Sequence, residues 1–167
     1  MCSSAVVVGQ LTGHGQIGDD TAVGISGFAH GAQMVTEQDI ESYMIQMGVS
    51  FKELGRKTWI LRDSEDLIES LVVSLNDPVV LFHVKLSEIP DNCDRLKLYE
   101  ELLRLNASEM LHGAYGLEGN AVIATDTLQA ENLDFNEFQA SVDAMNLCIS
   151  SHYKRISGFL KTDKPKS

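Results

Sequence analysis

The stretch that decides the fold is residues 98–128, LYEELLRLNASEMLHGAYGLEGNAVIATDTL. Its first part, up to Asn106, spaces apolar residues three and four apart, which predicts an amphipathic helix. After Gly113 the pattern changes to two short runs, 113–117 and 121–128, that are typical of paired strands. A compact turn at 118–120 separates the runs. The stretch therefore predicts a helix followed by a β-hairpin.

The apolar sector of this helix is wide. Leu98, Leu102 and Leu105 form one row at helical spacing, and Tyr99 and Leu103 lie on an adjoining side. A helix that rests on one sheet needs only one apolar stripe. The helix is either a deeply buried core helix or one that packs on a second surface. A second copy of the chain is the surface that we expect.

The residues before this helix predict one helix and four strands. Thr36 and Asp39 fit the capping box of a helix over 36–47. Two hairpins follow, the first with strands over 49–54 and 57–61 around Gly55 and Arg56, and the second with strands over 67–75 and 79–86. The residues between the second pair, 76–78, end in a proline, which is typical of a turn.

The last helix has the strictest pattern in the chain. Asp134 and Glu137 resemble its N-terminal cap, and apolar residues then alternate spacings of three and four as far as Phe159. This pattern fits a coiled-coil partner or lengthwise docking on a sheet, and we favour docking. His152 is the one polar member of the apolar row, and we expect it to be a hydrogen-bonded core residue.

The element order, α-β-β-β-β-α-β-β-α, predicts an α+β fold in which helices pack against an antiparallel sheet. The length of 167 residues suits a single domain, which we place at 34–160. Residues 1–33 hold seven of the 13 glycines and no Lys or Arg, and we expect a flexible leader. Met34 is an alternative start of the natural chain. Residues 161–167 are expected to form a basic tail.

A formal GxGxxG at 13–18 lies in the leader. A dinucleotide site needs a helix directly after these glycines and then a second strand, but Gly24, Gly27 and Gly31 interrupt the place of that helix. We therefore predict no nucleotide site. The three cysteines are odd in number and widely spaced, which fits neither a disulfide framework nor a metal motif.

The formal net charge of −11 argues against nucleic-acid binding, which requires clustered Lys and Arg. No Lys or Arg lies between Leu105 and Tyr153. That acidic half either keeps the protein in solution or attracts a basic partner segment. The longest strongly apolar run is too short to cross a membrane, and the N-terminus lacks the basic start of a signal peptide, so we expect a cytoplasmic protein.

The histidines are scattered, and the sequence has no local spacing of metal ligands and no nucleophile elbow. We predict no metal, no cofactor and no catalytic residue. The most site-like group is the loop of His112, Gly113, Ala114 and Tyr115, whose side chains could cooperate in proton transfer. A glycine and a hydrogen-bonding side chain are also what a loop entering a strand needs for its geometry. A small-molecule or catalytic site at this loop is therefore the alternative hypothesis.

The order of elements, the helix ending at Asn106, the strand start at 113–116 and the amphipathic last helix resemble the Tir-chaperone-like fold, which includes type III secretion chaperones and YbjN-like proteins. The resemblance covers residues 34 to about 160 and rests on pattern. It implies a non-enzymatic homodimer that binds an extended or partly unfolded protein client through apolar patches. The dimer contacts implied by position are Leu98, Tyr99, Leu102 and Leu103.

Overall fold

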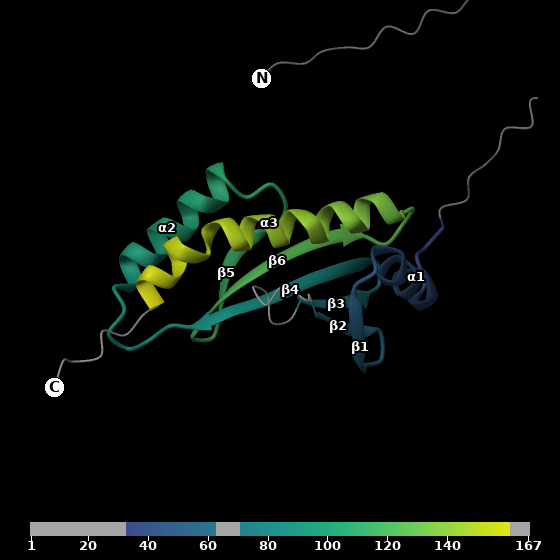
Figure 1. The fold of residues 1–167 in the computed structure, drawn as a ribbon, viewed down its shortest axis with the longest axis horizontal. Coiled ribbons are helices and arrows are strands. Elements are labelled where there is room, and N and C mark those ends of the chain that lie inside the picture. Colours follow the sequence, from purple (N-terminus) through teal and green to yellow (C-terminus); the bar gives the residue numbers. More distant parts are fainter. Residues whose placement is uncertain (1–32, 63–70, 161–167) are drawn as a thin grey trace, which may run out of the picture. The chain divides into compact units, whose positions relative to one another are not determined.

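The computed structural model describes residues 33–62 and 71–160. Its elements follow the predicted order and are drawn in Figure 1. They are α1 (Glu37–Met47), β1 (Ser50–Gly55), β2 (Thr58–Arg62), β3 (Leu71–Asn76), β4 (Val79–Glu88), α2 (Arg95–Ser108), β5 (Ala114–Glu118), β6 (Ala121–Gln129) and α3 (Phe135–Leu160). The predicted α+β class is confirmed, and strand bounds differ from the predicted ones by one or two residues where both are described.

The capping box predicted for α1 is present. The Asp39 amide donates to the Thr36 hydroxyl oxygen at 3.3 Å, and the Thr36 amide donates to the Asp39 carboxylate at 2.8 Å. These two hydrogen bonds satisfy amides that a helix start leaves without intrahelical partners. The helix ends at Gly48, whose φ of 70° suits glycine.

The six strands form one antiparallel sheet in the order β1-β2-β3-β4-β6-β5. Neighbouring strands are consecutive in sequence except at β4 and β6, which pair because β5 lies outside β6. Strands β1 and β5 are therefore the two edges of the sheet. The register places Trp59 opposite Val73, and Val73 opposite Phe82, so the three side chains share one face.

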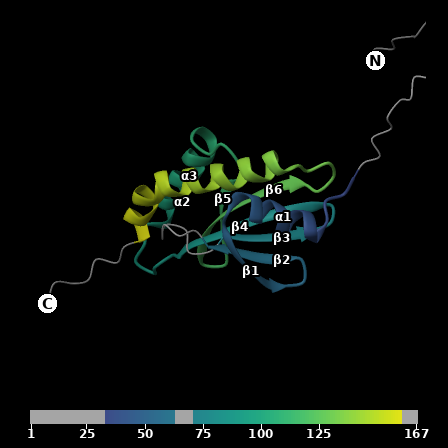
Figure 2. The same ribbon diagram turned by 45° about the vertical axis from the view of Figure 1, so that its right-hand side comes forward.

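All three helices pack on this face. The Trp59 indole N–H donates to Glu41 of α1 at 3.1 Å, and the Phe82 ring lies 5.3 Å from the Phe138 ring of α3. Helix α2 lies beside α3, as Figures 1 and 2 show. The core lies between the helices and this face, where Trp59, Val73 and Phe82 are almost completely buried. The predicted docking of α3 on the sheet is what the structure shows.

Helix α2 begins after Asp94, whose carboxylate accepts a hydrogen bond from the Lys97 amide at 3.3 Å. Its row of Leu98, Leu102 and Leu105 is buried against the core. After α2, Gly113 passes so close to β6 that an added Cβ would lie 2.3 Å from the carbonyl oxygen of Thr125. This close approach, together with a φ of +71°, requires glycine.

Three of the sequence predictions lie outside the described residues. These are the leader with its GxGxxG, the basic tail at 161–167, and the first part of the predicted strand over 67–75. Two further statements remain predictions: that residues 34–160 form one domain, and that Met34 is an alternative start of the chain.

Candidate functional site

The loop of His112, Gly113, Ala114 and Tyr115 contributes to several structural contacts. The Tyr115 amide donates to the side-chain oxygen of Asn106 at 2.7 Å, and the Asn106 side-chain amide donates to the Tyr115 carbonyl at 3.0 Å. His112 is about half exposed, and its Nδ1 lies 3.9 Å from the buried Asp126 carboxylate. His112 and Tyr115 therefore engage different partners, and the structure does not join them in one reacting pair.

The Tyr115 hydroxyl lies 2.9 Å from Nδ1 of His152, which is 4% exposed, as expected for a hydrogen-bonded core histidine. The His152 Nε2 faces the Glu109 carboxylate at 3.4 Å. A carboxylate accepts only, so this arrangement places a ring proton on Nε2, and the direction of the hydrogen bond between Nδ1 and the Tyr115 hydroxyl depends on the tautomer. Burial is the main cause that raises the pKa of Tyr115.

This chain of contacts continues to the surface through Arg155. One guanidinium nitrogen of Arg155 donates to Glu109 at 2.6 Å, and its Nε donates to Glu101 at 2.6 Å. The hydrogen bond from Arg155 lowers the pKa of Glu109, and the same bond raises the pKa of Arg155. We call Tyr115, His152, Glu109, Arg155 and Glu101 the polar clamp. It joins α2, β5 and α3.

Helix α2 carries a second apolar row that faces away from the core. Leu98 and Leu102 of the predicted dimer contact are buried within the chain itself, and Tyr99 is half-buried. Leu103 is 68% exposed. Three further leucines are also exposed and were not predicted: Leu96, Leu111 and Leu147. The spacing of Leu96, Tyr99 and Leu103 was the available signal for this outward row.

The other end of the sheet has its own exposed apolar side chains. Ile45 on α1 is 67% exposed and Leu54 on β1 is 55% exposed. Strand β1 is an edge strand whose residues are exposed apart from half-buried Phe51. An edge strand presents backbone donors and acceptors to which another chain can pair. Exposed apolar residues therefore lie at both edges, because Leu117 of β5 is 46% exposed.

Two pockets lie next to α3. The smaller, of about 200 Å³, is mainly apolar and lies between the end of β4 and the end of α3. Its lining residues are Leu86, Ser87, Tyr153, Ile156, Ser157 and Leu160. The larger, of about 440 Å³, is lined by His112, Leu128, Gln129, Glu131, Asn132, Glu137 and Ala140. The described residues contain no group of three metal-ligating side chains and no helix with the length and apolarity to span a membrane.

The CesT_Tir_1 family model matches residues 33–162. The chain belongs to this family of type III secretion chaperones. None of the curated proteins matches the chain.

Solved structures with the fold of this family include three similar chains. A chain in the heterodimeric ExoU–SpcU complex of the Pseudomonas aeruginosa type III secretion system is 17% identical, with a TM-score of 0.55, over 73% of this chain and 98% of that one. YbjN of E. coli, described as a putative transcription regulator, is 17% identical, with a TM-score of 0.56, over 74% and 96%. A chain in the HopA1–SchA chaperone–effector complex is 11% identical, with a TM-score of 0.51, over 69% and 90%.

At these identities the likeness to solved structures shows the fold alone. Membership of the family supports a chaperone-like, protein-binding role for this chain. The resemblance inferred from the sequence is confirmed.

Proposed function

We propose that the protein is a non-enzymatic, homodimeric chaperone-like module that binds an extended or partly unfolded segment of a protein client. The observation that carries the proposal is the pairing of each sheet edge with exposed apolar side chains. A client strand that pairs with an edge gains backbone hydrogen bonds, and its apolar residues gain buried area. The client stays unfolded elsewhere.

The dimer surface of this proposal is the outward row of α2, which includes Leu103, together with Leu111 after the helix and Leu147 on α3. Their exposed fractions are 68%, 70% and 57%. Isolated exposed leucines are common, but several close together on one helical layer are typical of an interface. Of the residues first assigned to the contact, Leu103 and Tyr99 offer surface to a second copy, whereas Leu98 and Leu102 support the helix from beneath.

The client surface of this proposal is the β1 edge with Ile45 and Leu54. This edge is separated from the α2 surface by the width of the sheet, since β1 and β5 are its two ends. A dimer formed through α2 therefore leaves β1 open to a client. The loop of residues 112–115 has less support as a chemical site, because Gly113 and Tyr115 are engaged in packing and in the polar clamp.

Sedimentation of the full chain tests the dimer, and a permanently unfolded probe, reduced and carboxymethylated α-lactalbumin, tests client binding. Leu103→Glu with Leu111→Glu should give a monomer that still binds the probe. The double variant Ile45→Glu with Leu54→Glu should remain a dimer but should no longer bind the probe. If the wild-type chain stays monomeric at micromolar concentration, the proposed dimer is wrong. If the wild-type chain does not bind the probe, the proposed client binding is wrong.

A further inference from the structure

The sheet face turned away from the three helices, here named the outer face, is the surface from which we draw a further inference. Residues alternate between the two faces along each strand, and the antiparallel register places Lys52 opposite Ile60, Ile60 opposite Val72, and Val72 opposite His83. Trp59 and Val73 point to the helices, so these residues point away from them. Among the described residues, no helix covers the outer face.

Apolar side chains form the middle of the outer face. Ile60 on β2 and Val72 on β3 lie side by side, and Leu81 on β4 and Ile123 on β6 lie on the same face, one to each side of the row that continues from Val72 to His83. All four are half-buried, whereas Trp59, Val73 and Phe82 on the helical face are 0–1% exposed. The middle of the outer face thus keeps apolar area that a partner could remove from water.

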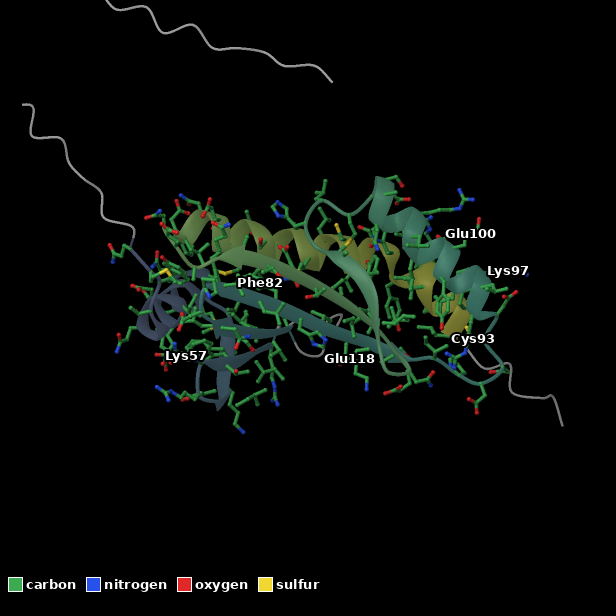
Figure 3. The ribbon with its side chains drawn as sticks, turned by 180° about the vertical axis from the view of Figure 1, so that it is seen from behind. Lys57, Phe82, Cys93, Lys97, Glu100 and Glu118 are labelled. Carbon is green, nitrogen blue, oxygen red and sulfur yellow. The ribbon has the colours of Figure 1, made fainter. Side chains whose placement is uncertain are left out.

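Basic side chains flank this apolar middle. Lys52 on β1, Arg62 on β2 and Lys85 on β4 alternate onto the outer face and are exposed. Lys85 forms an ion pair with Glu88. Within the described strands, the acidic side chains on this face are Glu88, the partner of Lys85, and Glu118 (labelled in Figure 3), which lies at the far edge and 3.7 Å from His83. Three cations against two acids give the outer face a small positive balance on a chain of net charge −11.

The backbone on this face decides the shape of its partner. Hydrogen bonds between strands run within the sheet, so the face offers no backbone donors or acceptors to an extended chain lying on it. A helix satisfies its own backbone and needs only side-chain contacts. A helix laid on a sheet is the usual way in which a half-apolar sheet face is covered.

We propose that the outer face binds an acidic amphipathic helix of the partner. The proposal rests on the chaperone-like function and adds a second kind of client segment to the strand at β1. Strands lie about 4.8 Å apart, so β1 with Lys52 and β4 with Lys85, which are three strand spacings apart, lie about 14 Å from each other. A helix is about 10 Å wide. Its apolar stripe would cover Ile60 and Val72, and carboxylates on both sides of the stripe would meet the two lysines.

The test uses two synthetic peptides of about 18 residues with the same Leu and Ala stripe, one with Glu and one with Lys on both flanks. Fluorescence anisotropy measures the binding of each peptide to the full chain. We expect the Glu peptide to bind and the Lys peptide to bind at least about tenfold more weakly. In NMR spectra, binding of the Glu peptide should change the backbone amide chemical shifts most at Ile60, Val72 and Leu81.

Charge variants separate this face from the rest of the surface. The double variant Lys52→Glu with Arg62→Glu should bind the Glu peptide about tenfold more weakly, or weaker still. Lys154→Glu, which changes an exposed charge on α3, is the matched control and should change the affinity little. Glu118→Gln should strengthen binding slightly. Equal affinity for both peptides, normal binding by the Lys52/Arg62 variant, or shifts confined to β1 and α2 would overturn the proposal.

The test must also separate the partner helix from the chain's own segment 63–70, DSEDLIES, whose sequence contains four acids and could compete for the same cations. If the Glu peptide binds only after these four acids are changed to amides, the assignment to a partner helix is wrong. If the unfolded probe binds normally while the Glu peptide does not, the helix proposal fails and the chaperone-like function stands. If neither probe binds, both fail.

Discussion

The two edges of the sheet are held in different ways. Strand β5 is held by both hydrogen bonds from Asn106 and by the polar clamp that joins it to α2 and α3. Strand β1 pairs with β2 and lies near α1, and its residues are mostly exposed. The difference agrees with the proposed roles, because a rigidly held end suits a permanent contact between copies and an open end suits a client that binds and dissociates.

The largest expected effect comes from adding a side-chain atom at Gly113, beside the β5 edge. Gly113→Ala places a Cβ 2.3 Å from the Thr125 carbonyl oxygen in a residue with φ of +71°. We expect a loss of about 3 kcal/mol or more in the free energy of unfolding, measured by urea denaturation. Gly119→Ala is the matched control, because its φ is also positive but no atom lies within 4 Å. Its cost should be about 1 kcal/mol.

Removing the side chain of Asn106 should be the next largest change. Asn106→Ala leaves the Tyr115 amide and carbonyl without their partners, which should cost about 2 kcal/mol. Hydrogen exchange of the Tyr115 amide should accelerate, while exchange in β1 and β2 should follow only the global stability. Asn106→Asp keeps the acceptor for the Tyr115 amide and should cost less. Equal acceleration in β1 would remove the distinction between the two edges.

At the open end, loss of the α1 cap should have a smaller effect. Thr36→Ala removes the hydroxyl that accepts from the Asp39 amide and should destabilise the protein by about 1 kcal/mol. Thr36→Ser keeps the hydroxyl and serves as the control. Local exchange should increase in the first turn of α1, and sedimentation should be unchanged. A shift toward monomer in Thr36→Ala would show that the two ends are coupled.

The smallest effect concerns alkaline pH. Burial raises the pKa of Tyr115 above its ordinary value of 10.0, so the folded chain keeps the phenol proton that the unfolded chain releases. The contribution of Tyr115 to stability is therefore complete below pH 10 and is lost as the pH rises above it. Denaturation midpoints between pH 8 and 11 should fall less steeply for Tyr115→Phe than for the wild type. Equal slopes would contradict a protected hydroxyl.

Local patterns were sufficient to predict the elements. The Thr36 and Asp39 cap, the hairpins and the long row of α3 all depend on residues close in sequence, and the structure contains them. The buried, hydrogen-bonded state of His152 also followed from its place in an apolar row. These features are set by spacing along one helix or strand.

The arrangement around α2 depends on distant residues and was harder to predict. A helical pattern identifies apolar rows but does not say which row the rest of the chain covers, so Leu98 and Leu102 were assigned to the dimer contact although they are buried within the chain. Glu109 and Arg155 are 46 positions apart. Their pairing requires the α2–α3 packing, which no local pattern specifies.

Edge strand β1 shifts its register against β2 between Glu53 and Gly55, and this irregularity bears on self-assembly. A regular, uncharged edge strand would let copies of the sheet join end to end without limit. Lys52 and Glu53 on β1, and Glu118 on β5, place charges along both edges. Random strand addition is therefore penalised, and a strand that does bind must be matched in charge and length. The edge that we propose as the client site is in this way kept from polymerising with itself.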